Sequence, residues 1–232
     1  MIVISSFNIQ NDIKNYSIDK EKEIIKYLKN NKIDILNLQE VYSKLDKDLA
    51  KDIDILKYNM FGKYRFFLKR ILNRINEKTP IITKYNVVSY KTYNLPFLPS
   101  TLKRVMTKVE VEIDGRLVSI YNTHIDYMMD ITKKRQLNKI LKIIRKDNNP
   151  IILTGDFNLK NNNEIFNNFR KEMKRININH IDVGDNTWKP SKYHRAIDHI
   201  FISDDFKLDS KEIVKNIEIS DHYPILIKVE FK

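Results

Sequence analysis

Cysteine is absent from the sequence. A chain without cysteine forms no disulfide scaffold, uses no thiol nucleophile and holds no zinc or iron–sulfur centre through thiolate ligands. Long apolar runs are missing as well, because none approaches the ~18 residues that a membrane-spanning helix needs. The first seven residues, Met-Ile-Val-Ile-Ser-Ser-Phe, carry no basic leader and no apolar stretch of export-signal length. We therefore expect a cytoplasmic protein without a transmembrane segment.

Glycine and proline are scarce, with 4 and 6 residues in a chain of 232. No stretch rich in serine, glycine or proline separates two halves of different composition, and the sequence has no repeat of fixed period. Hydrophobic residues make up 42% and charged residues 31%, which is typical of a folded protein and excludes a disordered one. The length is sufficient for a substantial core. We expect one domain over residues 1–232 and a monomer.

Short β-branched runs alternate with segments of helical periodicity along the chain. Strands are expected at 2–9, 33–38, 80–90, 104–113, 116–124, 151–154, 196–202 and 224–231, and helices from residue 19 and at 45–56 and 131–146. The Asp114-Gly115 pair between two of these strands predicts a type I′ hairpin. So many hairpins exclude a purely parallel sheet. The predicted fold class is α/β, with two mixed β-sheets packed face to face and helices outside.

Polar residues follow several of the expected strands at the point where each strand ends; in addition, Asp198 lies inside the expected strand 196–202, and Asp221 and His222 directly precede the last one. Asparagine and aspartate favour turns, and a lone histidine is often structural, so each residue alone has an ordinary explanation. Together they indicate a site, because strand ends at one edge of a sheet are where functional side chains gather. The residues are Asn8, Glu40, His124, Asp156, Asn158, Asp198, Asp221 and His222.

Six short motifs in a fixed order resemble the endonuclease/exonuclease/phosphatase superfamily. They are Phe-Asn-Ile-Gln, Leu-Gln-Glu, Asn-Thr-His, Gly-Asp-Phe-Asn, Ile-Asp-His-Ile-Phe and Ser-Asp-His-Tyr-Pro, and they run from about residue 4 to residue 226. Four residues recur by chance, but six motifs in family order do not. The resemblance implies a DNase-like fold, a four-layer α/β/β/α sandwich. It also implies hydrolysis of a phosphoester.

Carboxylate and amide oxygens suit a hard cation such as Mg²⁺, with Mn²⁺ as the alternative. Glu40 is the best candidate for direct ligation, and by family resemblance it carries the metal together with Asn8. Asp221 is expected to face the metal or a second water. The ion would neutralise a phosphate oxygen and stabilise charge on the leaving group.

Phosphodiester hydrolysis also needs an activated water. His222 is the expected general base, because imidazole titrates near working pH, and Asp198 would orient it by family position. Asp156 is a second candidate for the base, and the sequence leaves the choice open. The resemblance gives His124 the role of hydrogen-bond or proton donor and Glu77 the role of orienting His124.

Two further residues are assigned to phosphate contacts. Asn158 would donate its amide to the attacked phosphate. Arg104 matches a family arginine that contacts phosphate, and bidentate donors suit that task. The form Asn-Thr-His replaces the tyrosine-containing motif of abasic-site endonucleases, which disfavours that activity. His180, His194 and His199 are expected to be structural or surface residues.

Positive charge is concentrated in one part of the chain. The formal net charge is +12, and residues 57–108 contain twelve basic residues but a single acid, Glu77. Aromatic residues are interleaved with these cations. Cations follow a phosphate backbone and aromatic rings stack on bases, so nucleic acid is the first expected partner. An anionic membrane surface is the alternative, because Phe66-Phe67-Leu68 stands beside Lys69-Arg70.

The sequence thus predicts a Mg²⁺-dependent nuclease or phosphodiesterase acting on DNA or RNA. The second hypothesis is a lipid-headgroup phosphodiesterase or phosphatase of the sphingomyelinase or inositide type. A catalytically silent binding module is the third, and the intact motifs favour it least.

Overall fold

The computed structural model describes residues 1–10, 18–41, 59–61, 79–99, 102–184, 186–189 and 195–232. Within these residues the chain forms two six-stranded β-sheets and three helices. The first sheet has the order β11-β12-β1-β2-β4-β3. Its strands are β1 (Ile2–Asn8), β2 (Ile35–Gln39), β3 (Asn59–Phe61), β4 (Ile81–Thr83), β11 (Phe206–Ile213) and β12 (Ile225–Phe231).

The second sheet has the order β5-β6-β7-β8-β10-β9. Its strands are β5 (Asn86–Asn94), β6 (Val105–Ile113), β7 (Arg116–His124), β8 (Ile151–Asp156), β9 (Ile178–Ile181) and β10 (Asp198–Ser203). Each sheet contains one parallel pair, β1–β2 and β7–β8, among antiparallel neighbours. Both sheets are therefore mixed, as the sequence predicts.

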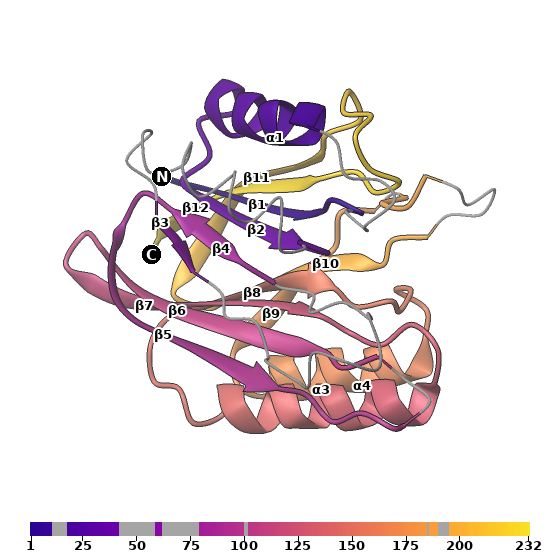
Figure 1. Cartoon of the computed structure of the whole chain (residues 1–232). Coiled ribbons are helices and arrows are strands. Elements are labelled where there is room, and N and C mark those ends of the chain that lie inside the picture. Colours follow the sequence, from indigo (N-terminus) through magenta and orange to yellow (C-terminus); the bar gives the residue numbers. More distant parts are fainter. Residues whose placement is uncertain (11–17, 42–58, 62–78, 100–101, 185, 190–194) are drawn as a thin grey trace, which may run out of the picture.

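Three helices cover the outer faces of the two sheets (Figure 1). Helix α1 (Ile18–Asn30) lies over the first sheet, and helices α3 (Asp130–Ile144) and α4 (Glu164–Lys174) lie over the second. The arrangement is the predicted α/β/β/α sandwich. None of the helices in the described part of the chain has the length and apolarity to cross a membrane.

Three apolar clusters hold these layers together. The central cluster lies between the sheets and is built from β-branched residues that alternate along the strands, such as Ile2 and Ile4 of β1 and Val109 and Val111 of β6. A second cluster packs the helices α3 and α4 on the second sheet. A third packs α1 on the first sheet. The period-two alternation of β1 explains why Phe7 faces α1 while Ile4 faces the other sheet.

The predicted hairpin at Asp114-Gly115 is confirmed. Both residues have positive φ, +50° and +73°, as a type I′ turn requires, and the flanking pair Ile113–Arg116 closes the β6–β7 ladder. One predicted strand is wrong in extent: residues 80–90 form parts of two strands, β4 and β5, which lie in different sheets. The predicted helix at 45–56 lies outside the described residues.

Helix α4 and strands β3, β9 and β11 are additional to the elements that the sequence predicts. The signal for α4 is present, since Asn163 caps its first turn and Phe166, Phe169 and Met173 face the core at helical spacing. Strand β11 gives no such signal. It is an outer strand, so most of its residues are exposed and polar and do not alternate with apolar ones.

A pair of histidines, the buried His199 and the half-buried His180, lies on β10 and β9, on the side of the sheet that α4 covers. His199 is 2% exposed and stacks on Phe166 with ring centroids 4.1 Å apart. His180 Nε2 lies 3.1 Å from His199 Nδ1. Burial, aided by the charge of Arg170, lowers the pKa of His180 to about 4, and burial also holds the pKa of His199 well below its usual range. Both rings are neutral at pH 7.

Replacing His180 should weaken the acid sensitivity of folding. The folded-state pKa of about 4 lies below the ordinary value of 6.5, so the unfolded chain binds more protons between these limits and stability falls as pH decreases through them. The loss is on the order of 1 kcal/mol per pH unit for each such histidine. His180→Gln removes one of the two groups, so its free energy of unfolding should fall less steeply. Urea unfolding at a series of pH values measures both slopes, and equal slopes would contradict the assignment.

Candidate active site

Strand ends bring the polar residues of the sequence motifs to one edge of the sandwich. In the first sheet Asn8 ends β1, and Glu40 directly follows β2. In the second sheet the parallel pair β7–β8 places His124 opposite Asp156, and the antiparallel pair β8–β10 places Asp198 opposite Asp156 on the other side. Asp156 is therefore the register neighbour of two other site residues. The strand pairing alone forces these three side chains together.

A glycine allows this close approach of β7 and β8. Gly155 lies opposite Thr123, and a Cβ atom built on it would stand 2.1 Å from the Thr123 carbonyl oxygen. The clash is with backbone, so no side-chain rotation relieves it. The glycine of the Gly-Asp-Phe-Asn motif thus sets the spacing of the strands that carry His124 and Asp156.

His222 and Asp198 form a buried pair. His222 Nδ1 lies 2.8 Å from Asp198 Oδ2, and the two residues are 5% and 1% exposed. The Ser220 hydroxyl accepts the backbone N–H of His222, and the Thr187 hydroxyl accepts the backbone N–H of Asp198. Both members of the pair are held from the backbone side as well. The contact is the one that the expected orientation of His222 by Asp198 requires.

Three carboxylates surround the imidazole of His222. Burial alone would lower its pKa, but Asp198, Asp156 and Asp221 outweigh burial and raise the pKa to about 10. For Asp198 the effect of burial has the opposite sign: burial raises the pKa of Asp198, and the charge of His222 opposes that rise. The proton shared by this pair belongs on His222, because its ring faces three negative groups at once. Without added positive charge, His222 is an imidazolium at neutral pH.

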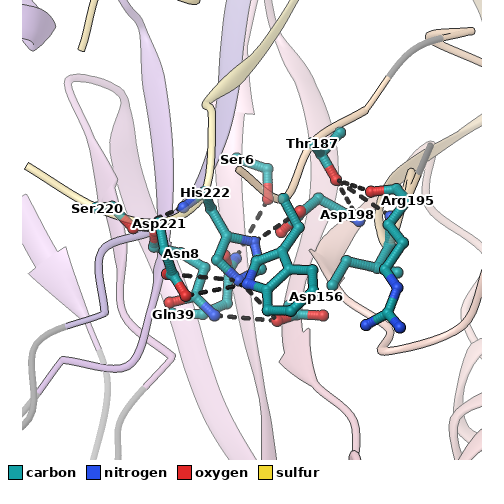
Figure 2. Close-up of polar contacts among 12 residues, drawn as sticks. Ser6, Asn8, Gln39, Asp156, Thr187, Arg195, Asp198, Ser220, Asp221 and His222 are labelled. Atoms are coloured by element: carbon teal, nitrogen blue, oxygen red, sulfur yellow. Dashed lines mark hydrogen bonds and ion pairs between the residues drawn. The ribbon is translucent and has the colours of Figure 1, made fainter. Parts of the chain in front are cut away.

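Asp156 stands at the centre of the site (Figure 2). Its carboxylate accepts the side-chain amide of Asn8 at 3.0 Å. It also accepts the backbone N–H of Asn158 at 2.8 Å. Two imidazoles face the same carboxylate, with His124 Nε2 at 3.5 Å and His222 Nε2 at 3.8 Å. The aspartate is 2% exposed. It therefore connects both predicted histidines to the first sheet.

Asn8 links two carboxylates across the sheets. Its Nδ2 donates to Glu40 Oε1 at 3.1 Å and to Asp156 Oδ2 at 3.0 Å, while its Oδ1 accepts the backbone N–H of Gln10. Glu40 has φ +57° and Asn158 has φ +48°, a left-handed conformation that costs a non-glycine residue roughly 1 kcal/mol or more. Strain of this kind gathers at functional sites, and here it aims both residues at the same cluster.

Asp221 is held by a tryptophan. Trp188, the single tryptophan of the chain, donates its indole N–H to Asp221 Oδ2 at 3.0 Å. Asp221 Oδ1 is buried, lies 3.9 Å from His222 Nε2 and accepts no hydrogen bond from the described residues. Asp198 Oδ1 is also buried and accepts no hydrogen bond from the described residues. These orphaned buried oxygens are atoms that a cation could satisfy.

The donor set fits a divalent cation of the Mg²⁺ type. The site offers carboxylate oxygens from Glu40 and Asp221, which both line the same cleft, and hard cations prefer oxygen ligands. Asp156, Asp198 and His222 also meet the spacing of a metal-binding group, with donor atoms within 4.8 Å of one another. A hydrogen bond already joins His222 to Asp198, so we favour the set of Glu40 and Asp221 for ligation. Asn8 would join it through Oδ1, which in this structure faces Gln10.

His124 and Asn158 form the other half of the site. Asn158 Nδ2 lies 3.1 Å from His124 Nε2 and donates to the Ile125 carbonyl oxygen at 3.0 Å. Arg104 NH1 lies 2.9 Å from His124 Nδ1, and Arg104 is 5% exposed. The predicted phosphate-binding arginine therefore contacts the histidine of the site. Glu77, expected to orient His124, lies outside the described residues.

A cleft of about 940 Å³ opens over this cluster. The site residues that line it are Glu40, Arg104, His124, Asp156, Asn158, Asp221 and His222, whereas Asn8 and Asp198 contact these residues from behind the lining. Its rim carries residues that the motifs do not include: Tyr127, Lys133, Lys160, Trp188 and Arg195. Arg195 lies over the Trp188 ring at 4.8 Å. Trp188 and Thr187 were missed in the sequence because they hold site residues from loops and follow no strand. Ser220 belongs to the Ser-Asp-His-Tyr-Pro motif, but the motif assigned it no role.

The family and the fold can now be stated. The family model described as the Endonuclease/Exonuclease/phosphatase family matches residues 5–222, so the chain belongs to this family of phosphoester hydrolases. A search of curated protein sequences gives no match.

Solved structures agree with this assignment over the whole chain. An endonuclease/exonuclease/phosphatase from Bacteroides vulgatus has a TM-score of 0.82 and 21% identity, with 100% of this chain and 99% of that chain covered. A mannosyl-6-phosphatase from Bacteroides thetaiotaomicron has a TM-score of 0.81 and 18% identity, with 100% of each chain covered. The human Nocturnin catalytic domain has a TM-score of 0.79 and 18% identity, with 100% and 93% covered. At these identities the likeness establishes the DNase-like fold.

Gly155→Ala should disrupt the fold at the site. Because the added methyl group meets the Thr123 carbonyl, β8 must move away from β7, and we expect a loss of about 3 kcal/mol or more in the free energy of unfolding. Gly115→Ala is the matched control: its φ is +73° but its added methyl group meets nothing within 4 Å, so the cost should be near 1 kcal/mol. Urea unfolding compares them. Equal losses would show that the close strand approach is unimportant.

Proposed function

We propose that the chain is a divalent-metal-dependent phosphodiester hydrolase that cleaves DNA or RNA by attack of an activated water on phosphorus. One observation carries the proposal: Asp156 contacts the Asn8–Glu40, Asp198–His222 and His124–Asn158 pairs, and one member or both of each pair line a single cleft with it. Acids, amides and imidazoles around one point are what in-line displacement at a phosphate needs.

The chain's own residues divide the work as follows. Asp156 and His222 are the two groups placed to take a proton from the attacking water, and Asp198 keeps the His222 ring in one orientation. Asn158 donates its amide to a phosphate oxygen, and His124 donates a hydrogen bond or a proton on the leaving-group side. Glu40, Asp221 and Asn8 would hold the cation. When bound, the cation supplies positive charge that stabilises the phosphoryl oxygens and opposes the carboxylates that keep His222 protonated.

Nucleic acid is supported by charge. The net charge is +12, and the cleft is lined by the cations of Arg104, Lys133, Lys160 and Arg195. Much of the basic aromatic segment 57–108 lies outside the described residues. Within its described part, Lys91 lies over the Tyr93 ring at 5.1 Å and Lys103 over the Phe97 ring at 5.1 Å. Such paired cations and rings suit a chain of phosphates and bases.

A lipid-headgroup substrate at an anionic membrane surface is the second candidate, favoured by one observation. Four large apolar side chains stand exposed within five residues next to the cleft: Tyr127 at 56%, Met128 at 52%, Met129 at 38% and Ile131 at 50%. Tyr127 also lines the cleft. Exposed apolar patches of this kind mark interaction or ligand-binding surfaces.

The site residues should be required for turnover but not for folding. Asp156→Ala, His222→Ala and Asp198→Asn should each lower kcat by about 100-fold or more, because proton transfer and the orientation of its base are lost. Asp209→Asn, an exposed carboxylate on the outer strand β11, is the control and should keep full activity. Steady-state kinetics with circular dichroism of each variant tests this. Wild-type turnover in any folded site variant would remove that residue from the mechanism.

A substrate panel with and without metal tests the proposed activity. Plasmid DNA and single-stranded RNA should be cleaved with Mg²⁺ and spared after EDTA, and binding should weaken steeply with salt, because phosphate contacts release counterions. Sphingomyelin vesicles and a sugar phosphate monoester complete the panel, the latter because one structural relative is a mannosyl-6-phosphatase. Cleavage confined to the vesicles would favour the second candidate. Cleavage of the monoester alone would replace both.

A further inference from the structure

The histidine pair of β9 and β10 contacts the backbone of the segment that follows β8, on the face of the sheet opposite the active site. His199 follows Asp198 directly in β10, so the two side chains point to opposite faces of the sheet. Asp198 faces the site, whereas His199 lies on the helix side against Phe157 and Phe166. Neither the motifs nor the proposed mechanism gives His199 a task. A polar ring in an apolar layer nevertheless needs a reason, because burying it carries a desolvation penalty.

The hydrogen bonds of the pair fix both tautomers. His199 Nε2 lies 2.8 Å from the Leu159 carbonyl oxygen, which accepts only, so His199 carries its proton on Nε2. In the neutral ring Nδ1 is then a bare acceptor. His180 Nε2 lies 3.1 Å from that atom and must donate to it. One chain of donation runs from His180 through His199 to Leu159.

The Leu159 carbonyl belongs to the segment that carries the reactive groups. This segment begins at Asp156 and passes through Asn158, whose left-handed φ of +48° must be maintained by its surroundings. Its start is tied by the Phe157 N–H, which donates to the Ile197 carbonyl at 2.9 Å. Its end is tied by the His199 side chain. Both ties come from residues 197–199.

Three consecutive residues thus set the geometry of two parts of the site. Ile197 and His199 hold the Asp156–Leu159 segment, and Asp198 between them holds His222. We propose that His199 is a positioning residue, which fixes Asp156 and Asn158 relative to the Asp198–His222 pair, and that His180 fixes its tautomer. The inference rests on the proposed function, because it assigns His199 a role in presenting groups to a phosphate.

A purely structural role predicts something different. If His199 only filled the layer around Phe166, a phenylalanine in its place would serve as well, because the ring and its stacking remain. If the N–H to Leu159 matters, phenylalanine fails and glutamine succeeds, because its side-chain amide can donate from near the Nε2 position. The two substitutions separate packing from donation.

Kinetics of three variants provide the first test. In His199→Phe we expect kcat to fall about tenfold with KM changed less than about twofold, because the misplaced groups act on the reacting phosphoryl group and not on the rest of the substrate. His199→Gln should restore most of kcat. Ser203→Ala is the matched control: its hydroxyl accepts the buried Ile151 N–H at the far end of β10, so the variant loses stability without losing kcat. Full kcat in folded His199→Phe would overturn the proposal.

A second readout does not need activity. Long-range ¹⁵N–¹H NMR should show His180 and His199 as neutral rings, with the His199 proton on Nε2. The Asn158 side-chain and backbone amide resonances should shift in His199→Phe, return in His199→Gln and stay unchanged in Ser203→Ala. Unchanged Asn158 resonances in His199→Phe would refute the positioning role. If the Asn158 resonances shift while no phosphoester is turned over, the proposed function fails, but the positioning of the Asp156–Leu159 segment by His199 is retained.

Discussion

The carboxylate of Asp156 is the group on which the two halves of the sandwich converge. It is 2% exposed, and a buried charge is costly unless hydrogen bonds and opposite charges replace the lost water. The donors come from both sheets, since Asn8 belongs to β1 and Asn158 follows β8. Beside it, Gln39 of β2 donates to Asn122 of β7 at 2.6 Å, which adds a second polar link between the sheets. The apolar layer holds the sheets together along most of their length, whereas these polar links fix the position of one sheet relative to the other at the site.

The negative charge of Asp156 and its acidic neighbours destabilises the folded site. Four acidic residues, Glu40, Asp156, Asp198 and Asp221, are gathered at one edge, and two of their buried oxygens accept no hydrogen bond from the described residues. The protonated His222 offsets part of this repulsion, which is why its pKa is raised to about 10. A base, however, must give up its proton near neutral pH. The negative charge of the cluster is therefore only partly neutralised. A bound cation would both stabilise the fold and lower the pKa of His222, which would free it for proton transfer.

Sequence patterns predicted the fold class and the central residues because strand termini leave a local signal. Asn8, His124 and Asp156 each end a β-branched run and His222 stands shortly before one, and the mixed sheets follow from the hairpins between such runs. The supports of the site leave no such signal. Trp188 and Ser220 act from loops, and His199 resembles an ordinary strand residue until its partner, the Leu159 carbonyl forty positions away, is seen. Strand β11 is mostly exposed to solvent, so its sequence carries no apolar pattern. Helix α4 packs on the core, so its apolar residues recur at helical spacing.

Chemistry and substrate choice reside in different parts of this structure. The reactive groups sit on strand ends, and the strand order fixes their separation, so relatives with identities near 20% superpose on the whole chain. Yet one of those relatives is a mannosyl-6-phosphatase and another is the Nocturnin catalytic domain. The shared fold therefore does not by itself fix the substrate. For the proposed activity we expect substrate choice to depend on the rim of the cleft, where Tyr127, Lys160 and Arg195 lie outside the strands and helices. Substitutions at the rim should change which phosphoester is bound, whereas substitutions on the strand ends should change whether any is cleaved.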